Sequence, residues 1–247
     1  MKMHIISSGS KGNASFIYDK ETTILIDFGI SLRRLKAGLK EIDKTIDDID
    51  YCLCTHNHSD HSKSIKYLKN KDWYCRKGTI SNFVNPHELE VFNRYLFGEI
   101  VVTPLLTSHD AIAPCGFLFE ENNETIAYIT DTGYIPEETL SFIKNCDYYF
   151  FESNYDEDML KNSDRSQYLK YRILSEKGHL SNVRSAEYLS KLIGDKTKAI
   201  MLAHISQECN TKELALKTCE NILKKNNVNI NKIIISCASQ WNSEDLC

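Results

Sequence analysis

The residues best suited to chemistry lie together in the pattern His56-x-His58-x-Asp60-His61. Three of the chain's eight histidines fall within six positions here, directly after a run of apolar residues. On an extended backbone His56 and His58 point to the same side, so both can bind one metal ion. Asp60 and His61 are offset and can bind a second ion close by. Imidazole and carboxylate together suit zinc, manganese or iron. The pattern therefore predicts a metal centre rather than a hydrophilic surface loop.

Three further candidate ligands are His109, Asp131 and His204. Each follows an apolar segment that has the composition of a β-strand. Taken singly, each could be a capping or turn residue. Taken together with the histidine-rich segment, they supply the additional ligands that two ions require.

Two adjacent cations define the chemistry that such a site can perform. Ions about 3.5–4 Å apart can share a bridging water and stabilise an in-line displacement. A bound metal lowers the pKa of water from 15.7 to about 7, so hydroxide is available at neutral pH. This suits hydrolysis of a phosphodiester, and it suits hydrolysis of a lactam or thioester as well.

The segments that must position these residues alternate between strands and helices. Strands are predicted at Met3–Ser7, Ala14–Tyr18, Thr23–Asp27, Asp50–Thr55, Ile100–Thr107, Cys115–Phe119, Thr125–Thr130, Asp147–Glu152, Lys198–Ala203 and Asn229–Cys237. Helices are predicted after an N-cap at Ser31, with Leu32, Leu35, Leu39 and Ile42 at helical spacing, and at Ser62–Lys69, Pro136–Lys144, Ser181–Leu192 and Thr211–Lys225. Two such halves favour an α/β protein, an αββα sandwich of two mixed sheets with outer helices. Without a repeat or a linker, one domain over residues 1–247 is expected.

Composition limits the partners and the compartment. The 247 residues carry a formal net charge of −4, so a nucleic-acid partner would need a local basic patch. No apolar run is long enough to cross a bilayer, and the first residues do not resemble a signal peptide, so no membrane association and a cytoplasmic location are expected. The nine cysteines are scattered without a Cys-x-x-Cys pair, so free thiols are expected. Cys52 and Cys54 could serve as soft ligands, although better ligands follow them.

The chain resembles the metallo-β-lactamase superfamily. Asp27, the His56–His61 segment, His109, Asp131 and His204 match the motifs of this superfamily in order. The resemblance implies the αββα fold and a ligand assignment. His56, His58 and His109 would bind one ion, Asp60, His61 and His204 the other, and Asp131 both. Asp27 would orient the ligands without binding metal.

Glu152 and His179 distinguish branches within the superfamily. A glutamate at a strand end and a histidine before a helix can form a hydrogen-bonded pair, which would leave a proton for a leaving oxygen. Alternatively, His179 merely precedes an N-cap at Ser181. The pair resembles the acid pair of the RNase Z branch. A wider set of motifs resembles the YycJ/WalJ-like group, namely the segments Ser8–Asn13, Ser108–Asp110, Glu152–Asn154, Gly178–Asn182 and Ala203–Ser206. That resemblance implies a 5′-to-3′ exonuclease acting on DNA, in which Asp60 or a metal-bridging hydroxide activates the nucleophile and His179, backed by Glu152, protonates the leaving group.

Candidate substrate-binding residues come from the same motifs. They are Ser8, Asn13, Asn154, Arg172 and Asn182. The segment from Ser7 to Asn13 could donate backbone N–H groups to a phosphate, or it could simply be a tight turn near the metals. The basic residues between 161 and 177 could line a path for a nucleic-acid strand or form a solvated helix face.

Two other interpretations compete with the nuclease. A small-molecule hydrolase acting on a lactone, thioester or cyclic phosphodiester would have an apolar pocket and no use for the Glu152–His179 pair. A non-catalytic protein could keep the metals for structure or sensing, in a site closed to water. The chain has no room for the inserted domain of β-CASP nucleases, and no basic Gly/Pro-rich insertion could serve as the tRNA-binding arm of RNase Z.

Overall fold

Two seven-stranded mixed sheets form the centre of the computed structural model, which describes residues 1–247. The first sheet has the order β14 (Glu244–Asp245), β1 (Lys2–Ser7), β2 (Ala14–Tyr18), β3 (Thr23–Ile26), β4 (Tyr51–Leu53), β5 (Trp73–Cys75), β6 (His87–Glu88). The second has the order β13 (Ile234–Cys237), β12 (Ala199–Ala203), β11 (Tyr148–Glu152), β10 (Glu124–Ile129), β9 (Cys115–Glu121), β8 (Ile100–Leu106), β7 (Tyr95–Phe97). Part of each sheet is parallel and part is antiparallel.

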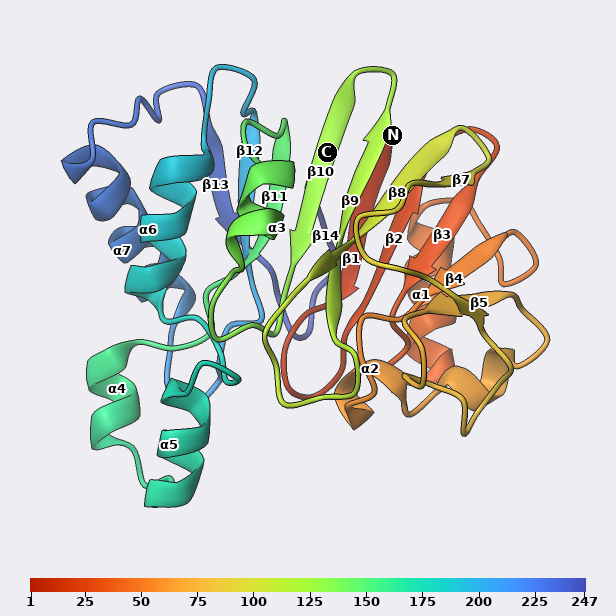
Figure 1. The fold of residues 1–247 in the computed structure, drawn as a ribbon, viewed down its shortest axis with the longest axis horizontal. Helices are drawn as coiled ribbons and strands as arrows, with labels where there is room; N and C mark the ends of the chain where they lie inside the picture. The colour runs from red at the N-terminus through yellow and green to blue at the C-terminus, as the bar shows by residue number, and fades with distance from the viewer.

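Helices cover the outer faces of both sheets (Figure 1). The helices of the chain are α1 (Leu32–Glu41), α2 (Ser59–Ser62), a 3₁₀ turn (Ile65–Leu68), α3 (Glu137–Phe142), α4 (Glu157–Asn162), α5 (Gln167–Leu174), α6 (Asn182–Leu192) and α7 (Lys212–Lys225). The α1 helix and the 3₁₀ turn pack on the first sheet, and α3, α6 and α7 pack on the second. The predicted αββα sandwich of two mixed sheets is thus confirmed.

Three apolar layers hold the sandwich together. Side chains such as Ile5, Phe117 and Tyr128 fill the space between the sheets. The outer layers lie between each sheet and its helices. Because alternate residues of a strand face opposite sides, one strand serves two layers, as Phe150 and Phe151 of β11 do.

Several predicted elements are shorter than expected or were missed. The helix predicted at Ser62–Lys69 is a single α-turn, α2, followed by a 3₁₀ turn, because the Ser64 amide donates to the Phe28 carbonyl across the chain. The last strand begins at Ile234 rather than Asn229, since Asn229 to Lys232 form a turn.

The α4–α5 hairpin was not predicted. Both helices have side-chain N-caps, at Asp156 and Ser166. The helical periodicity of α5 is obscured because Tyr168 and Tyr171 on its outer face are each 81% exposed. The hairpin rests on a small core of its own and projects beyond the sheets (Figure 1).

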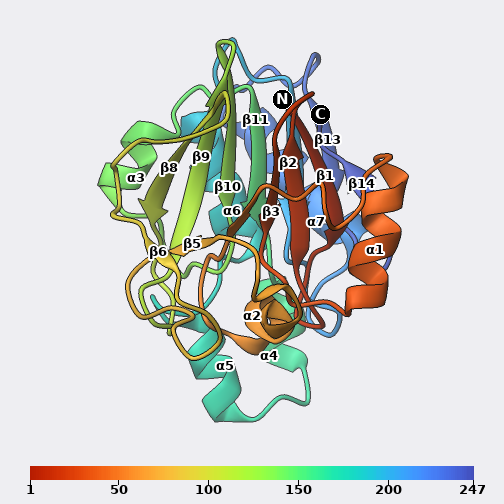
Figure 2. The same ribbon diagram turned by 90° about the vertical axis from the view of Figure 1, so that its right-hand side faces the viewer.

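The parallel strands decide where the site forms. The segments β3–β4 and β10–β11–β12 are parallel, so their carboxyl ends meet at one edge of the sandwich. Figure 2 shows α2, α4 and α5 gathered at this edge, at the end opposite to the two termini.

Two predictions from composition can be compared with the structure. All nine cysteines are free, and eight are buried. Cys52 and Cys54 belong to the apolar layer under α1 and take no part in the histidine cluster. No helix combines the length and the apolar character that crossing a membrane requires.

Candidate metal centre

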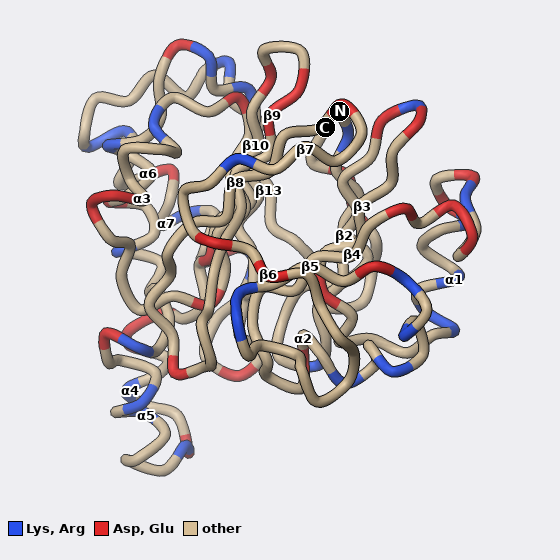
Figure 3. Tube along the Cα trace, turned by 45° about the vertical axis from the view of Figure 1, so that its right-hand side comes forward, with Lys and Arg blue, Asp and Glu red and all other residues tan.

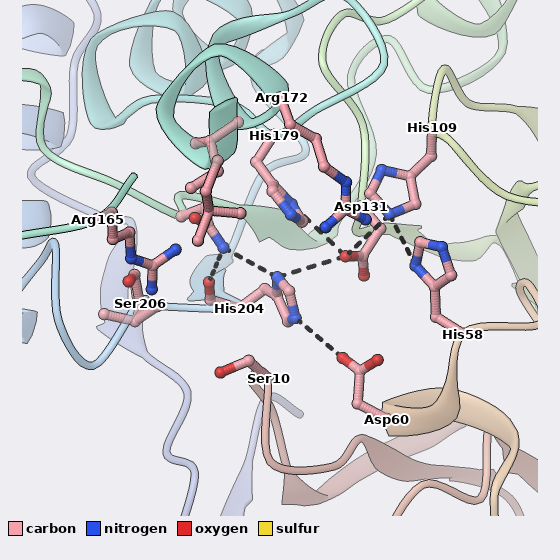
Figure 4. A pocket seen from close by; sticks show the side chains of 14 residues that line it. Ser10, His58, Asp60, His109, Asp131, Arg165, Arg172, His179, His204 and Ser206 are labelled. Atoms are coloured by element: carbon pink, nitrogen blue, oxygen red, sulfur yellow. Dashed lines mark hydrogen bonds and ion pairs between the residues drawn. The ribbon is translucent and has the colours of Figure 1, made fainter. Parts of the chain in front are cut away.

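All seven predicted ligands converge at the carboxyl edge of the strands. His56 and His58 follow β4, Asp60 and His61 lie on α2, and the other three, His109, Asp131 and His204, follow β8, β10 and β12. The side chains that line the cavity converge from several elements (Figure 4). The segments brought together are separated by up to 148 positions in the sequence, so only the pairing of strands unites them.

The histidines and carboxylates form four overlapping groups that could each hold a metal ion, and two of these groups share no residue. Donor atoms of His56, His58 and His109 lie within 4.8 Å of one another, and so do those of Asp60, His61 and His204. These are the two sets that the superfamily resemblance implies.

Asp131 lies between the two groups. Its Oδ2 is 3.2 Å from His61 Nε2, and its Oδ1 is 3.8 Å from His109 Nε2. One carboxylate can therefore face both metal positions, as the predicted bridging role requires.

Buried contacts set which nitrogen each histidine presents. His61 Nδ1 donates to Asp27 Oδ2 at 2.7 Å, and the other oxygen of Asp27 accepts from the Thr55 amide at 2.8 Å. His109 Nδ1 donates to the Gly178 carbonyl at 2.9 Å. In both rings Nε2 is left to face the cluster, as expected when a second group fixes the tautomer of a metal-binding imidazole.

Three residues of the site adopt a left-handed backbone. The φ angles of Asp27, Asp131 and His204 are 59°, 53° and 55°. Each residue directly follows, or lies within two positions of, the end of a parallel strand, where this turn redirects the side chain into the cluster. Such conformations cost roughly 1–3 kcal/mol each and persist where the surrounding structure enforces them.

The donor atoms fit divalent cations. His56 Nε2, His204 Nε2 and Asp131 Oδ2 are buried and have no hydrogen-bond partner within the protein. A buried polar atom without a partner costs about 1–3 kcal/mol. Cations held by the histidines and aspartates would satisfy all three atoms, and the mixture of nitrogen and oxygen donors suits zinc, manganese or iron.

Burial and neighbouring charges set the protonation of the candidate metal ligands. Burial holds the pKa of the His56 and His109 imidazoles below the ordinary value, so both stay neutral with a free lone pair. Burial opposes ionisation of Asp60, but His61 and His204 lower the pKa of that carboxyl to about 2. Burial opposes protonation of His61 and His204, but the carboxylates around them raise the pKa of both rings, to about 10 for His204. Because neutral imidazoles and ionised carboxylates are the forms that bind metal, these two rings release a proton when metal binds.

Glu152 and His179 form a close pair beside the cluster. His179 Nδ1 donates to Glu152 Oε1 at 2.6 Å, while Glu152 Oε2 accepts from the amides of Thr132 and Leu180 at 2.8 and 3.3 Å. Burial raises the pKa of Glu152, yet the His179 imidazole outweighs this and lowers it. Glu152 and His179 are close enough to Asp131 and His204 to act as ligands themselves. Because both oxygens of Glu152 are already engaged, a positioned acid pair is the better interpretation.

The cavity over the cluster is small and polar. Its volume is about 190 Å³, and only three of its 14 lining residues are hydrophobic. Arg172 lines it and forms a two-pronged ion pair with Asp110. Asn154 also lines it, where its amide donates to the His204 carbonyl at 2.8 Å.

The structure also brings to the cavity residues that were not among the candidate site residues, although Arg165 is one of the basic residues between 161 and 177 that could line a path for a nucleic-acid strand. Arg165, Ser10 and Ser206 line it alongside the predicted residues (Figure 4). The two serines lie within motifs that the sequence singles out, so proximity to Ser8 and His204 was an available signal. Arg165 reaches the cavity only because the α4–α5 hairpin folds over it.

Three of the predicted substrate-binding residues are not brought to the cavity. Ser8, Asn13 and Asn182 are each at most 3% exposed and are absent from its lining. The Ser8 hydroxyl accepts from the His204 amide, and Asn182 bonds to Ser153 and Asn210. These side chains hold the site's framework in place.

The segment from Ser7 to Asn13 is a tight turn. Its amides at Gly9, Lys11, Gly12 and Asn13 all donate to acceptors within the protein. Of the two interpretations from sequence, the turn near the metals therefore fits these four amides, whereas the N–H of Ser10, which lines the cavity, makes no hydrogen bond within the protein.

Comparisons with known proteins agree with this geometry. The model of a family described as the β-lactamase superfamily domain matches residues 22–205, which include all seven candidate ligands. The exodeoxyribonuclease WalJ of Streptococcus pneumoniae is 35% identical over 236 residues, with 90% of this chain and 88% of the relative covered. The exodeoxyribonuclease YycJ of Bacillus anthracis is 34% identical over 233 residues, with the same coverage.

Solved structures share the fold at low sequence identity. The metallo-β-lactamase fold protein YhfI of Bacillus subtilis superimposes with a TM-score of 0.73 at 14% identity, covering 99% of this chain and all of that one. Zn²⁺-bound PqqB from Methylobacterium extorquens gives 0.71 at 14% identity, with both chains fully covered.

Fold, donor set and relatives together define a metal-dependent hydrolase that binds divalent metal. The chain belongs to the metallo-β-lactamase superfamily and, within it, to the YycJ/WalJ-like group.

Removing metal should destabilise the protein. The buried donor atoms lose their partners when metal is removed. A metal present at a free concentration about 1,000 times its dissociation constant stabilises the folded state by about 4 kcal/mol. A chelator should therefore lower Tm by on the order of 10 °C. Thermal unfolding with and without EDTA measures the shift. His87→Ala, on the exposed edge strand β6, should keep the full shift, whereas His56→Ala should lose most of it. An unchanged Tm on chelation of the metal-loaded protein would contradict the metal centre.

Gly29→Ala should damage the metal centre from behind. A methyl group at Gly29 would overlap the backbone carbonyl of Asp60, so α2 would have to move. We expect lower bound metal, measured by elemental analysis, and a loss of about 1–3 kcal/mol in stability. Gly78→Ala is the matched control: its φ of +81° makes this substitution destabilising as well, but the methyl would meet only Ile112 at 3.5 Å, so metal content should be unchanged. Full metal content in Gly29→Ala would refute this dependence.

Proposed function

We propose that the protein is a dinuclear metal-dependent phosphodiesterase that degrades DNA stepwise from a 5′ end. The observation that carries this proposal is the Glu152–His179 pair, held at 2.6 Å beside the ligand cluster in a cavity that also contains Arg165 and Arg172. Two relatives covering 90% of the chain are named exodeoxyribonucleases, which supports a DNA substrate. The polarity comes from the resemblance to the YycJ/WalJ-like group.

The lining of the cavity argues against the small-molecule alternative. A lactone or thioester pocket would be mainly apolar. Here three of the 14 lining residues are hydrophobic, and two arginines are present. The Glu152–His179 pair is also suited to an alcohol leaving group. The cavity is open to solvent, with the His179 side chain 17% exposed, which disfavours a purely structural metal site.

The proposed mechanism divides the work among residues of the chain. When bound, two divalent cations supply water of lowered pKa and stabilise negative charge on phosphoryl oxygens. The ligand set is His56, His58 and His109 for one ion, Asp60, His61 and His204 for the other, and Asp131 for both. Asp27 fixes the orientation of His61 through Nδ1.

His179 protonates the leaving group in this mechanism. Glu152 accepts the Nδ1 hydrogen of His179, which orients the ring. His179 Nε2 then holds the proton that passes to the departing 3′ oxygen. Arg172, anchored by Asp110, lies where it can contact phosphate oxygens.

The reaction itself can be tested with end-labelled DNA and RNA, single-stranded and duplex, in Mn²⁺ and separately in Zn²⁺. We expect stepwise loss of nucleotides from the 5′ end of DNA. The variant with Asp60→Ala and His61→Ala should be inactive, because it lacks two ligands. If neither metal supports cleavage of any nucleic acid, the nuclease proposal fails, and lactones, thioesters and cyclic phosphodiesters become the substrates to test.

The role of His179 can be separated from metal binding by the leaving group. His179→Ala should lower kcat on DNA by about 10²–10⁴-fold, the usual contribution of a general acid. The loss should be much smaller on bis(p-nitrophenyl) phosphate, because p-nitrophenolate leaves without a proton. Glu152→Gln should show the same pattern, with bound metal unchanged in both variants. Equal losses on both substrates together with loss of metal would instead identify the pair as ligands.

A further inference from the structure

A second hollow lies next to the metal centre, and its charge differs from that of the rest of the protein. Lys11, Arg34, Lys63 and Lys66 line it, and none of its lining residues is acidic. The whole chain has a formal net charge of −4, so this concentration of positive charge is local. Figure 3 shows lysine and arginine positions gathered around α2 and the neighbouring segments. We call this hollow the basic groove.

The basic groove is joined to the metal cavity through the backbone. Ser10 lines the cavity, and the next residue, Lys11, lines the groove. Lys63 directly follows α2, which carries Asp60 and His61, and its Nζ donates to the Lys11 carbonyl at 3.0 Å. A chain of phosphates that leaves the metals past Ser10 would enter the basic groove.

Two exposed aromatic side chains also line the groove. Trp241 is 65% exposed and Tyr67 is 55% exposed, although large aromatic residues are usually well buried. A cation lies near each ring: the Arg34 guanidinium is 5.8 Å from the centre of Trp241, and Lys66 Nζ is 5.3 Å from that of Tyr67.

The position of Trp241 is fixed by its neighbours. Arg34, which lies near the ring, donates to the Ile6 carbonyl at 3.0 Å. Gln240, which directly precedes Trp241 in the sequence, is buried and donates to Ser7 Oγ at 2.7 Å. The indole is therefore carried on a rigid base while most of its surface remains open.

We propose that the basic groove binds a single-stranded stretch of DNA and guides it to or from the metal centre. Lysines matched to a phosphate backbone, interleaved with aromatic rings on which bases can stack, are how proteins bind single strands without sequence preference. This inference rests on the proposed nuclease function, since it assigns the strand path for the same site. It also predicts weak sequence preference, because every base has a face that can stack.

Tryptophan fluorescence gives a direct test in the full-length chain. Trp73 is 1% exposed, so quenching by a DNA base reports on Trp241. Oligothymidylate should quench the emission of the inactive Asp60→Ala, His61→Ala protein, and of the unaltered protein in EDTA. Trp241→Ala should abolish the quenching and weaken binding, measured by fluorescence anisotropy, by about tenfold through loss of the stacking face.

Charge reversal tests whether the lysines neutralise phosphates. Lys63→Glu with Lys66→Glu should weaken oligothymidylate binding at least about tenfold and make log K less dependent on log salt, by about 0.7 for each phosphate that is no longer neutralised. Lys217→Glu with Lys232→Glu, at exposed positions on α7 and before β13, is the matched control and should bind as the unaltered protein does. Heparin should compete without quenching Trp241, because it has no bases.

The outcomes distinguish this inference from the nuclease proposal. If oligothymidylate quenches Trp241 and the Lys63→Glu, Lys66→Glu variant loses binding, strand binding in the groove is supported, even if DNA is never cleaved. Cleavage of DNA with no quenching, or with both pairs of lysine variants binding equally, overturns the groove and leaves the nuclease proposal standing.

Discussion

The rest of this structure depends on one constraint. Metal-binding atoms are buried although they have no hydrogen-bond partner within the protein. His56 Nε2, His204 Nε2 and Asp131 Oδ2 are all buried and make no hydrogen bond within the protein. Each would cost free energy unless a cation satisfied it. The left-handed turns at Asp27, Asp131 and His204 add to this cost. The three apolar layers of the sandwich supply the stability that makes such a site sustainable.

Close backbone approach keeps the two halves of the site aligned. The absence of a side chain at Gly29 lets the Asp60 carbonyl lie against it, and the Asn13 amide donates to that same carbonyl at 2.7 Å. The α2 turn is thus held from two sides by the first sheet. On the second sheet, Glu152 is held by backbone amides and in turn holds His179. Positions fixed in this way keep donors in place without rearrangement during a reaction.

The two walls of the cavity have different characters. The α4–α5 hairpin contributes Arg165 and Arg172, both of which already pair with a carboxylate, Glu208 or Asp110. The basic groove lies on the α2 side, and no acidic residue lines it together with its lysines. A polyanion is therefore attracted more strongly toward the groove, since paired arginines offer less free charge. An acidic protein can in this way direct a nucleic acid to one face.

The sequence by itself determined the chemistry and most of the framework. The histidine-rich segment and the ligands at strand ends are local patterns, because a strand's hydrophobic run and the polar residue that ends it are adjacent in the chain. The predicted αββα sandwich and nearly all of its long strands are present, since alternation of apolar residues is also a local property. The Glu152–His179 contact could be suggested because each residue borders a predicted element, and the family resemblance then linked the two across 27 positions.

Tertiary structure decided which side chains contact one another. Ser8, Asn13 and Asn182 lie in motifs near the metals, but whether a polar side chain points into a cavity or into the framework depends on neighbours distant in sequence. The α4–α5 hairpin escaped prediction because its exposed tyrosines conceal the helical pattern, and only this hairpin decides that Arg165 reaches the cavity. The basic groove combines Lys11, Lys63 and Trp241, which no local pattern connects. Charge and residue type are written in the chain, whereas the surface on which they gather exists only after the sheets have paired.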